Sequence, residues 1–213
     1  LPEVDAFIGV DEISRIDEII EKLDTAKGNP AIFQVNPKPC FIYDEKSPRF
    51  LLTPRHYTYL KIAEGCNNGC TYCLIPRIKG RYRSRTIESV LAEAKNLTAN
   101  YPLKEVIIIA EDTTYYGMDL YGKLALSDLL QEMVTLPWDK EQRIRILYSH
   151  PAHYDDCLIE TIAKNPLICP YLDIPLQHIS NNVLERMNRK IYQKDILKQI
   201  GRASCRERVC VGV

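Results

Sequence analysis

Residues 57–76 read YTYLKIAEGCNNGCTYCLIP, and this stretch decides the fold. Its first seven residues predict a β-strand, and the strand runs directly into a loop that holds Cys66, Cys70 and Cys73. A C-x3-C-x2-C spacing brings three thiols close together without any long-range folding. The stretch therefore predicts a strand that leads into a cluster of metal-binding cysteines.

The chain that follows repeats a strand-then-helix pattern. Residues 105–110 (EVIIIA) are apolar without alternation, as buried parallel strands are. Apolar residues at helical spacing follow each strand, and Thr86 is the expected N-cap of the first helix. The expected strands are 57–63, 105–110, 143–148 and 171–174, and the expected helices lie around 87–97, 126–134, 158–162 and 183–187. About four βα units predict an α/β fold, either an open doubly wound sheet or a partial (β/α) barrel.

Polar and aromatic residues stand where each predicted strand ends. They are the cysteine loop, residues 111–117 (EDTTYYG), His150 and the segment Leu176–His178 (LQH). In both architectures the chemistry takes place at the carboxyl ends of the strands. We therefore expect these four loops to converge on one site.

The remainder of the chain predicts four regions. Residues 1–27 contain an expected strand at 4–10 and a helix with Ile13, Ile16, Ile20 and Leu23 on one face. Residues 28–54 are rich in proline and read as a linker, and residues 55–199 form the main domain. Residues 200–213 (IGRASCRERVCVGV) lack an amphipathic period and resemble a sequencing-adapter sequence read through as protein, so we expect a non-native tail.

Composition narrows the class of protein. The 213 residues are 46% hydrophobic, and 28 basic residues balance 28 acidic ones, which gives no general nucleic-acid footprint. No stretch approaches the roughly 20 apolar residues of a membrane span. Clustered cysteines beside isolated ones favour metal binding in a reducing compartment over disulfides. We therefore expect a soluble, cytoplasmic protein with no membrane contact.

Three cysteines leave two readings of the metal site open. A structural zinc site needs a fourth ligand, and the nearest candidates, Cys40 and His56, do not have zinc-finger spacing. An iron–sulfur cube held by three thiolates instead leaves one iron open to a ligand. A zinc-stabilised α/β binding module is therefore the non-enzyme alternative to an iron–sulfur enzyme.

The C-x3-C-x2-C loop, with the aromatic Tyr72 before its third cysteine, resembles that of the radical S-adenosylmethionine (radical SAM) enzymes. The resemblance implies a radical SAM core and a [4Fe–4S] cluster held by Cys66, Cys70 and Cys73, with S-adenosylmethionine on the open iron. It suggests Tyr72 as a contact of S-adenosylmethionine, and the location of Asp112 after a predicted strand suggests Asp112 as a second contact.

Three longer stretches, at residues 60–85, 110–122 and 171–189, narrow the resemblance to the methylthiotransferases. They are most similar to the group that methylthiolates the β-carbon of an aspartate in a small-subunit ribosomal protein; the alternative is the tRNA adenosine methylthiotransferases (MiaB-like). Glu111 departs from the first group's usual glutamine, whereas Asp112 agrees with it. Residues 1–27 would be the end of the family's N-terminal α/β domain.

The resemblance also implies what lies outside this chain. The family's N-terminal domain holds a second [4Fe–4S] cluster, and later barrel strands and a TRAM domain follow the core, so we expect a truncated and inactive fragment. A reductant such as flavodoxin or ferredoxin would be a partner. Basic residues occupy every second position from Arg77 to Arg85; if this segment is extended, they would share one face and contact an anion or ribosomal RNA.

Overall fold

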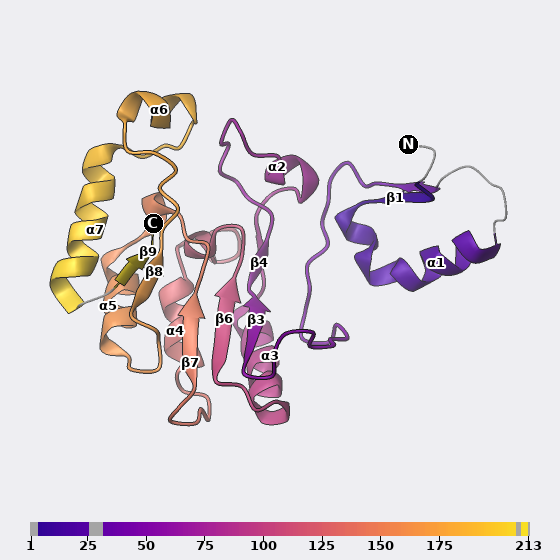
Figure 1. Ribbon diagram of the computed structural model, residues 1–213, viewed down its shortest axis with the longest axis horizontal. Helices are drawn as coiled ribbons and strands as arrows, with labels where there is room; N and C mark the ends of the chain where they lie inside the picture. The colour runs from indigo at the N-terminus through magenta and orange to yellow at the C-terminus, as the bar shows by residue number, and fades with distance from the viewer. Residues whose placement is uncertain (1–3, 26–31, 208–209, 213) are drawn as a thin grey trace.

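The computed structural model describes residues 4–25, 32–207 and 210–212, with side chains within 4–25 and 32–202. Figure 1 shows a small first unit beside a larger α/β unit. The α-helices are α1 (Ile16–Thr25), α2 (Ile75–Ile78), α3 (Ile87–Asn100), α4 (Leu126–Met133), α5 (Asp156–Lys164), α6 (Asn181–Arg186) and α7 (Gln193–Glu207). The strands are β1 (Ala6–Ile8), β2 (Ile32–Gln34), β3 (Tyr57–Lys61), β4 (Ala63–Glu64), β5 (Arg83–Ser84), β6 (Glu105–Ile109), β7 (Arg143–Ile146), β8 (Tyr171–Asp173) and β9 (Cys210–Gly212). Short 3₁₀ helices cover Val10–Arg15, Thr113–Tyr115 and Pro151–His153.

The first unit is β1, a 3₁₀ turn, α1 and β2. The expected strand and a helix both form, but Ile13 lies in the 3₁₀ turn, and Ile13, Ile16 and Ile20 of the expected apolar face are exposed while Ile19 is buried. β2 lies inside the segment 28–54 that was expected to be a linker. β2 pairs with β1 in parallel, and Phe7 stacks on Phe33 with ring centroids 4.7 Å apart. The linker expectation is therefore wrong for residues 32–34, because three residues are too short a run for sequence periodicity to reveal a strand.

The carboxylate of Asp11 fastens the next segment to this unit. It accepts hydrogen bonds from the backbone N–H groups of Cys40 (2.9 Å) and Phe41 (2.8 Å) and from the Asn36 amide (2.6 Å). Burial alone would raise the pKa of Asp11, but these bonds outweigh burial and lower it. Part of the segment between the two units is thus held by specific bonds despite its proline content.

The core of the larger unit is a parallel sheet in the order β3-β6-β7. All four expected strands form close to the expected residues, but only three make a continuous hydrogen-bonded sheet. β8 runs beside β7, linked by an isolated parallel bridge between Ile144 and Ile168 and by a bond from Ser149 N to Asp173 O (3.3 Å). The parallel strands with their crossover helices confirm the α/β prediction, and the arrangement is a partial barrel rather than a closed one.

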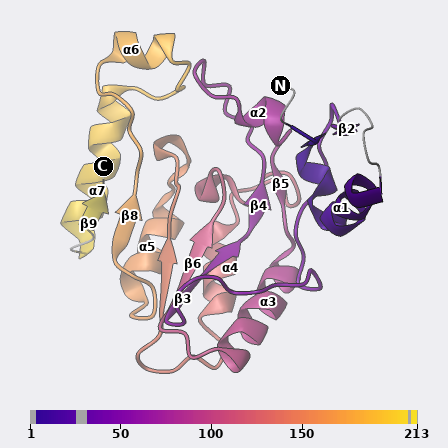
Figure 2. The same ribbon diagram turned by 45° about the vertical axis from the view of Figure 1, so that its right-hand side comes forward.

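Helices α3, α4 and α5 cover one face of this sheet (Figures 1 and 2). Leu60, Val106 and Ile144 from the strands are fully buried in a single core with the apolar faces of these helices. Thr86 caps α3 as expected, because its hydroxyl accepts a bond from Ser89 N at 3.3 Å. The other face carries an ion pair between Glu105 and Arg145 (2.5 Å) and is more polar. Packing on one face leaves the carboxyl ends of the strands free to carry loops.

The edge of β3 is covered by the segment that precedes it. Arg49 donates to the carbonyl of Tyr59 and, at 3.0 Å, to the hydroxyl of Thr58, and it pairs with Glu93 on α3. These contacts occupy groups that an exposed edge strand would offer to another chain.

Helix α7 crosses the boundary that was expected at Ile200. It continues to Glu207, and the backbone of β9 pairs with β8 in parallel. The helix continues because no proline interrupts residues 200–207 and most of these residues sustain a helix once it has started. That the tail is non-native stays a prediction.

Within the described part of the chain, no helix has the length and apolar character needed to cross a membrane.

Candidate metal and cofactor site

The cysteine loop leaves the sheet at the carboxyl end of β3. Gly65 turns the chain with φ +78°, and a Cβ there would lie 2.3 Å from the carbonyl oxygen of Arg81. Glycine is therefore required directly before Cys66. Backbone bonds from Cys66 N to Gly80 O (3.3 Å) and from Cys73 N to Cys70 O (3.1 Å) shape the loop.

The three cysteines are free thiols on this loop. Cys66 and Cys70 are buried and Cys73 is partly exposed. All three line one pocket of about 360 Å³. Burial raises the pKa of Cys66 to about 11, so its thiol is protonated at neutral pH until a metal displaces the proton.

Loops from the other strands complete the same pocket. Glu111 after β6, His150 after β7 and Gln177 after β8 all line it. The expected convergence of the four loops is therefore confirmed. His178 is exposed and is not among the lining residues.

The two residues expected to contact S-adenosylmethionine, Tyr72 and Asp112, differ in whether they line the pocket. Tyr72 lines the pocket with half of its surface exposed, so its ring is accessible to a ligand. Asp112 is 2% exposed and does not line the pocket; it lies behind the loops. Their roles stay predictions.

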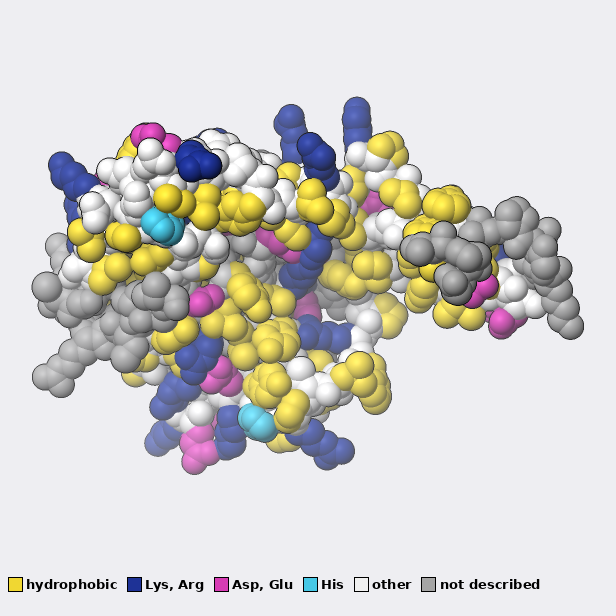
Figure 3. Space-filling model, turned by 45° about the horizontal axis from the view of Figure 1, so that its top comes forward, with side chains coloured by type: hydrophobic (Ala, Val, Ile, Leu, Met, Phe, Trp, Pro, Cys, Tyr) yellow, Lys and Arg dark blue, Asp and Glu magenta, His cyan; other side chains and the backbone are white. Residues whose placement is uncertain are grey.

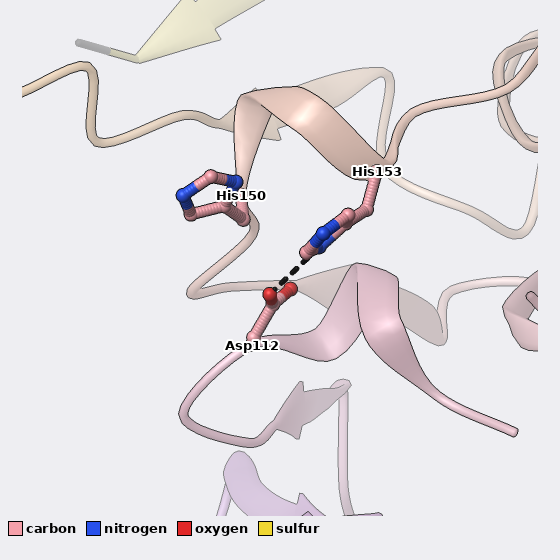
Figure 4. Close-up of side chains that lie close together, drawn as sticks. All are labelled: Asp112, His150 and His153. Carbon is pink, nitrogen blue, oxygen red and sulfur yellow. Dashed lines mark hydrogen bonds and ion pairs between the residues drawn. The ribbon is translucent and has the colours of Figure 1, made fainter. Parts of the chain in front are cut away.

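Asp112 connects loops that are distant in the sequence. Its carboxylate accepts bonds from the Asn68 amide (2.8 Å), the Thr114 hydroxyl (2.7 Å) and His153 Nδ1 (2.8 Å), the last of which Figure 4 shows. Burial alone would raise the pKa of Asp112, but the bonds from His153 and Thr114 outweigh burial and lower it. Asp112 is thus an ionised hub that ties the cysteine loop to the loop after β7.

Asp112, His150 and His153 also form a group whose potential ligand atoms all lie within 4.8 Å of one another. Among the described His, Cys, Asp and Glu residues, the three cysteines do not form such a group. In Figure 4 one edge of the His150 ring points away from Asp112. Both oxygens of Asp112 already accept protein hydrogen bonds. We therefore interpret these three residues as structural groups that hold the loops in place, and not as a metal site.

A second charged network lies beside the cysteine loop. Lys79 pairs with Glu64 (2.8 Å) and with Glu111 (2.6 Å), and Lys61 also pairs with Glu64. Burial lowers the pKa of Lys79, but the bonds to Glu111 and Glu64 outweigh burial and raise it. One oxygen of Glu111, Oε2, is buried without a hydrogen-bond partner. Glu111 therefore has one oxygen paired with Lys79 and one buried oxygen that remains free to accept a hydrogen bond.

The segment from Arg77 to Arg85 is not extended, so the condition under which its five basic residues would share one face is not met. α2 and the turn at Gly80 (φ +77°) interrupt the segment, so the side chains point in different directions. Arg85 is buried against Glu93, Lys79 joins the network just described, and Arg83 donates to backbone carbonyls, including that of Phe41 at 3.0 Å. On the face shown in Figure 3, lysine and arginine side chains are scattered rather than gathered into one patch.

The sequence analysis missed Arg189. This residue follows α6, is 6% exposed and lines the pocket opposite the cysteines' own loop; its Nη1 lies 3.8 Å from Cys70 Sγ. Asn188 donates to the Gly69 carbonyl (2.7 Å), and Thr71 N bonds to Met187 O (3.1 Å). No local pattern marks an arginine that meets a cysteine 119 positions away.

Two pocket residues have unusual backbones. Tyr148 has φ 60° and Gln177 has φ 68° although neither is glycine. Left-handed conformations cost non-glycine residues about 1–2 kcal/mol. Such outliers gather at functional sites, where the surrounding structure holds them in place.

Comparison with family models supplies the decisive observation for this pocket. The model described as "Radical SAM superfamily" matches residues 60–206, which is more than half of the chain. The chain belongs to the radical SAM superfamily. The match begins in β3 and contains the whole cysteine loop and every pocket residue described above.

Curated relatives narrow the likeness within the radical SAM superfamily. The chain is 44% identical over 200 residues to "Ribosomal protein uS12 methylthiotransferase RimO" of Clostridioides difficile (strain 630), covering 94% of this chain and 44% of that relative. It is 47% identical over 190 residues to the protein of the same name from Clostridium novyi (strain NT), covering 89% of this chain and 41% of that one. The chain thus spans less than half the length of these relatives.

Solved structures support the fold. The radical S-adenosylmethionine methyltransferase TsrM from Kitasatospora setae, with tryptophan substrate and a SAM analogue bound, aligns with TM-score 0.60 at 17% identity, over 78% of this chain and 33% of that one. The cobalamin-dependent S-adenosylmethionine radical enzyme OxsB, with aqua-cobalamin and S-adenosylmethionine bound, aligns with TM-score 0.56 at 13% identity, over 74% and 23%. At these identities the likeness concerns the α/β fold alone.

Proposed function

We propose that this chain is the radical SAM portion of a methylthiotransferase that modifies an aspartate of a small-subunit ribosomal protein. The observation that carries the proposal is the set of three free thiols on one loop, in a pocket at the carboxyl ends of the strands. The name shared by these relatives, of whose length the chain spans less than half, supports the substrate class. Neither relative reported above is named as a tRNA enzyme, so the MiaB-like alternative lacks this support.

The donor set fits a [4Fe–4S] cluster. Soft thiolates select iron–sulfur clusters, zinc or copper(I). A single zinc ion needs its ligand atoms close together around it, and the three cysteines are not among the described groups whose ligand atoms lie within 4.8 Å of one another. Cys66, Cys70 and Cys73 would hold the cluster. The cluster and S-adenosylmethionine together would supply the one-electron chemistry that removes hydrogen from an unactivated C–H bond.

The residues of this chain would bind S-adenosylmethionine, hold it in one orientation and enclose it in the pocket. Tyr72 would lay its exposed ring against S-adenosylmethionine, and Asp112 would act through the loops that it joins rather than by reaching into the pocket. Glu111 Oε2, a buried acceptor without a partner, suits a cationic group in the pocket. The same proposal includes a cytoplasmic location and a reductant such as flavodoxin or ferredoxin. It also includes a contact with RNA through Arg77 and Arg81, which are exposed.

Anaerobic reconstitution with iron and sulfide tests the proposal. We expect about four irons per chain and an electron paramagnetic resonance spectrum of the reduced protein that S-adenosylmethionine changes. Substitution of Cys66, Cys70 and Cys73 by alanine should abolish iron binding, whereas Cys40→Ala, at an exposed cysteine outside the pocket, should not. One zinc per chain and no iron would instead establish the zinc-stabilised module.

The substrate class needs a separate experiment with the full-length protein. Mass spectrometry of ribosomal protein and of tRNA after incubation with reductant and S-adenosylmethionine should show a methylthio group on the protein only. A methylthio group on tRNA adenosine would overturn the ribosomal substrate but leave the metal site intact.

A further inference from the structure

Two residues that line the same pocket as the cysteines each carry a buried N–H donor without an acceptor. The donors are Nε2 of His150 and Nε of Arg189, and neither has a hydrogen-bond partner in the described structure. The two residues are 5% and 6% exposed. Leaving a buried donor unsatisfied costs about 1–3 kcal/mol, and more for a charged group, so two such donors on residues that line one pocket call for a shared explanation.

The hydrogen bonds of His150 define which of its nitrogens donates. Its Nδ1 accepts a bond from the backbone N–H of Ala152 at 3.2 Å. Burial and the neighbouring charge of Arg189 lower the pKa of His150 to about 4, so the ring is neutral at pH 7. Because Nδ1 is the acceptor, the single ring proton is on Nε2. His150 therefore carries one neutral N–H donor.

Arg189 is a buried cation without a carboxylate partner among the described residues. Its Nη2 donates to the carbonyl of Pro175 at 2.6 Å, and its Nη1 lies 3.8 Å from Cys70 Sγ. Arg85, which is also buried, contrasts with it, because Arg85 pairs with Glu93 and its Nε also donates to Ser89 at 3.2 Å. Buried charges are usually paired with a counter-charge, but no carboxylate among the described residues pairs with Arg189. The Cys70 sulfur is the group that faces its Nη1, and its Nε remains without any acceptor.

The backbone around Arg189 holds it in this place. Its neighbours Asn188 and Lys190 both have left-handed conformations, with φ 54° and 53°. Two strained residues on either side of one buried side chain indicate that its position is imposed by the surrounding structure. The loop is also tied to the cysteine loop through the Asn188 amide and Thr71 N.

We propose that Arg189 and His150 form a carboxylate-binding subsite beside Cys70. A guanidinium and a neutral N–H donor on two residues that line one pocket can together supply charge and direction for a carboxylate. The inference rests on the proposed function, which offers two sources of that group: the methionyl carboxylate of S-adenosylmethionine and the side chain of the substrate aspartate.

Four binding measurements on the reconstituted chain distinguish the sources. The ligands are S-adenosylmethionine, its decarboxylated analogue, and, with S-adenosylmethionine present, a short peptide with one aspartate and its asparagine twin. We expect Arg189→Met to weaken one carboxylate ligand by about tenfold to a hundredfold and to leave its carboxylate-free twin unchanged. A loss confined to S-adenosylmethionine identifies the methionyl group, and a loss confined to the aspartate peptide identifies the substrate.

His150 allows a test by rescue. His150→Asn can keep an acceptor near Nδ1 but removes the Nε2 donor, whereas His150→Gln can place an amide N–H near Nε2. We expect the first variant to weaken the same ligand by about tenfold and the second to restore most of its affinity. Arg186→Met is the matched control, because this exposed arginine lies three positions from Arg189 and should leave every affinity unchanged.

Two results would overturn the subsite. One is an equal loss for a ligand and its carboxylate-free twin; the other is no loss for any ligand. Iron counts on every variant keep the two proposals separate: a full cluster without carboxylate dependence refutes the subsite alone, whereas no iron in the unmodified chain refutes the proposed function.

Discussion

The two walls of the pocket are built in different ways. The first wall is the cysteine loop, residues 65–73, in which three thiols follow from local spacing on a single turn of chain. The facing wall, His150, Gln177 and Arg189, comes from loops after β7 and β8 and after α6. The thiols that we propose as metal ligands thus lie within nine consecutive residues, whereas the position of the facing groups depends on the packing of the whole sheet.

The largest expected effect comes from the residue that joins both walls. Asp112→Ala leaves the donors of Asn68, Thr114 and His153 without their acceptor. Breaking a buried charged network of this kind costs about 3–5 kcal/mol. Urea unfolding should show this loss, together with lower iron loading. The control is Asp128→Ala, at an exposed ion pair with Lys123, and equal losses in the two variants would show that Asp112 does not join the walls.

Substitutions at two glycines test the first wall, the cysteine loop, by itself. Gly65→Ala places a Cβ 2.3 Å from the Arg81 carbonyl oxygen at φ +78°, whereas Gly122 has φ +68° and open space around it. We expect a loss of about 3 kcal/mol for the first and about 1 kcal/mol for the second. Thermal unfolding and iron counts check this, and unchanged iron loading in Gly65→Ala would contradict the role of this turn.

The stability of the chain should depend on pH through His150 of the facing wall. The pKa of His150 falls from an unfolded value of 6.5 to about 4, so the unfolded chain binds more protons between these values. The associated stability is complete above pH 6.5 and is lost as the pH falls toward 4; it amounts to about 2 kcal/mol between pH 6.5 and pH 5.

Denaturant titrations of the metal-free chain at several pH values measure this slope. His150→Asn should remove it, because the variant has no imidazole to protonate. A slope that persists in the variant would assign the pH dependence to other groups.

The smallest effect is expected at the opposite end of the sheet. Lys104 and Glu141 form an ion pair there, with side chains 58% and 76% exposed. Solvent screens such pairs, so Lys104→Met should change stability by no more than about 0.5 kcal/mol and should leave iron loading intact. A larger change would mean that charge pairs far from both walls also support the site.

Much of the main domain was predictable from local pattern. Apolar runs identified the strands, helical spacing identified the helices, and Thr86 marked the start of α3, because each of these signals acts within a few residues. The same reasoning failed for β2, which is three residues long, and left open the conformation of the basic segment, where the turn at Gly80 disperses the side chains.

By itself, the sequence determined the α/β class, the order of its units and the grouping of Cys66, Cys70 and Cys73, because periodicity and short spacing are local properties. Only the tertiary structure decided that Arg189 meets Cys70 and that Asp112 supports the site from behind. It alone showed that His150 lines the pocket and that its Nε2 is buried without a partner. Burial and the meeting of distant loops depend on how the strands and helices pack, and no single stretch of residues encodes them.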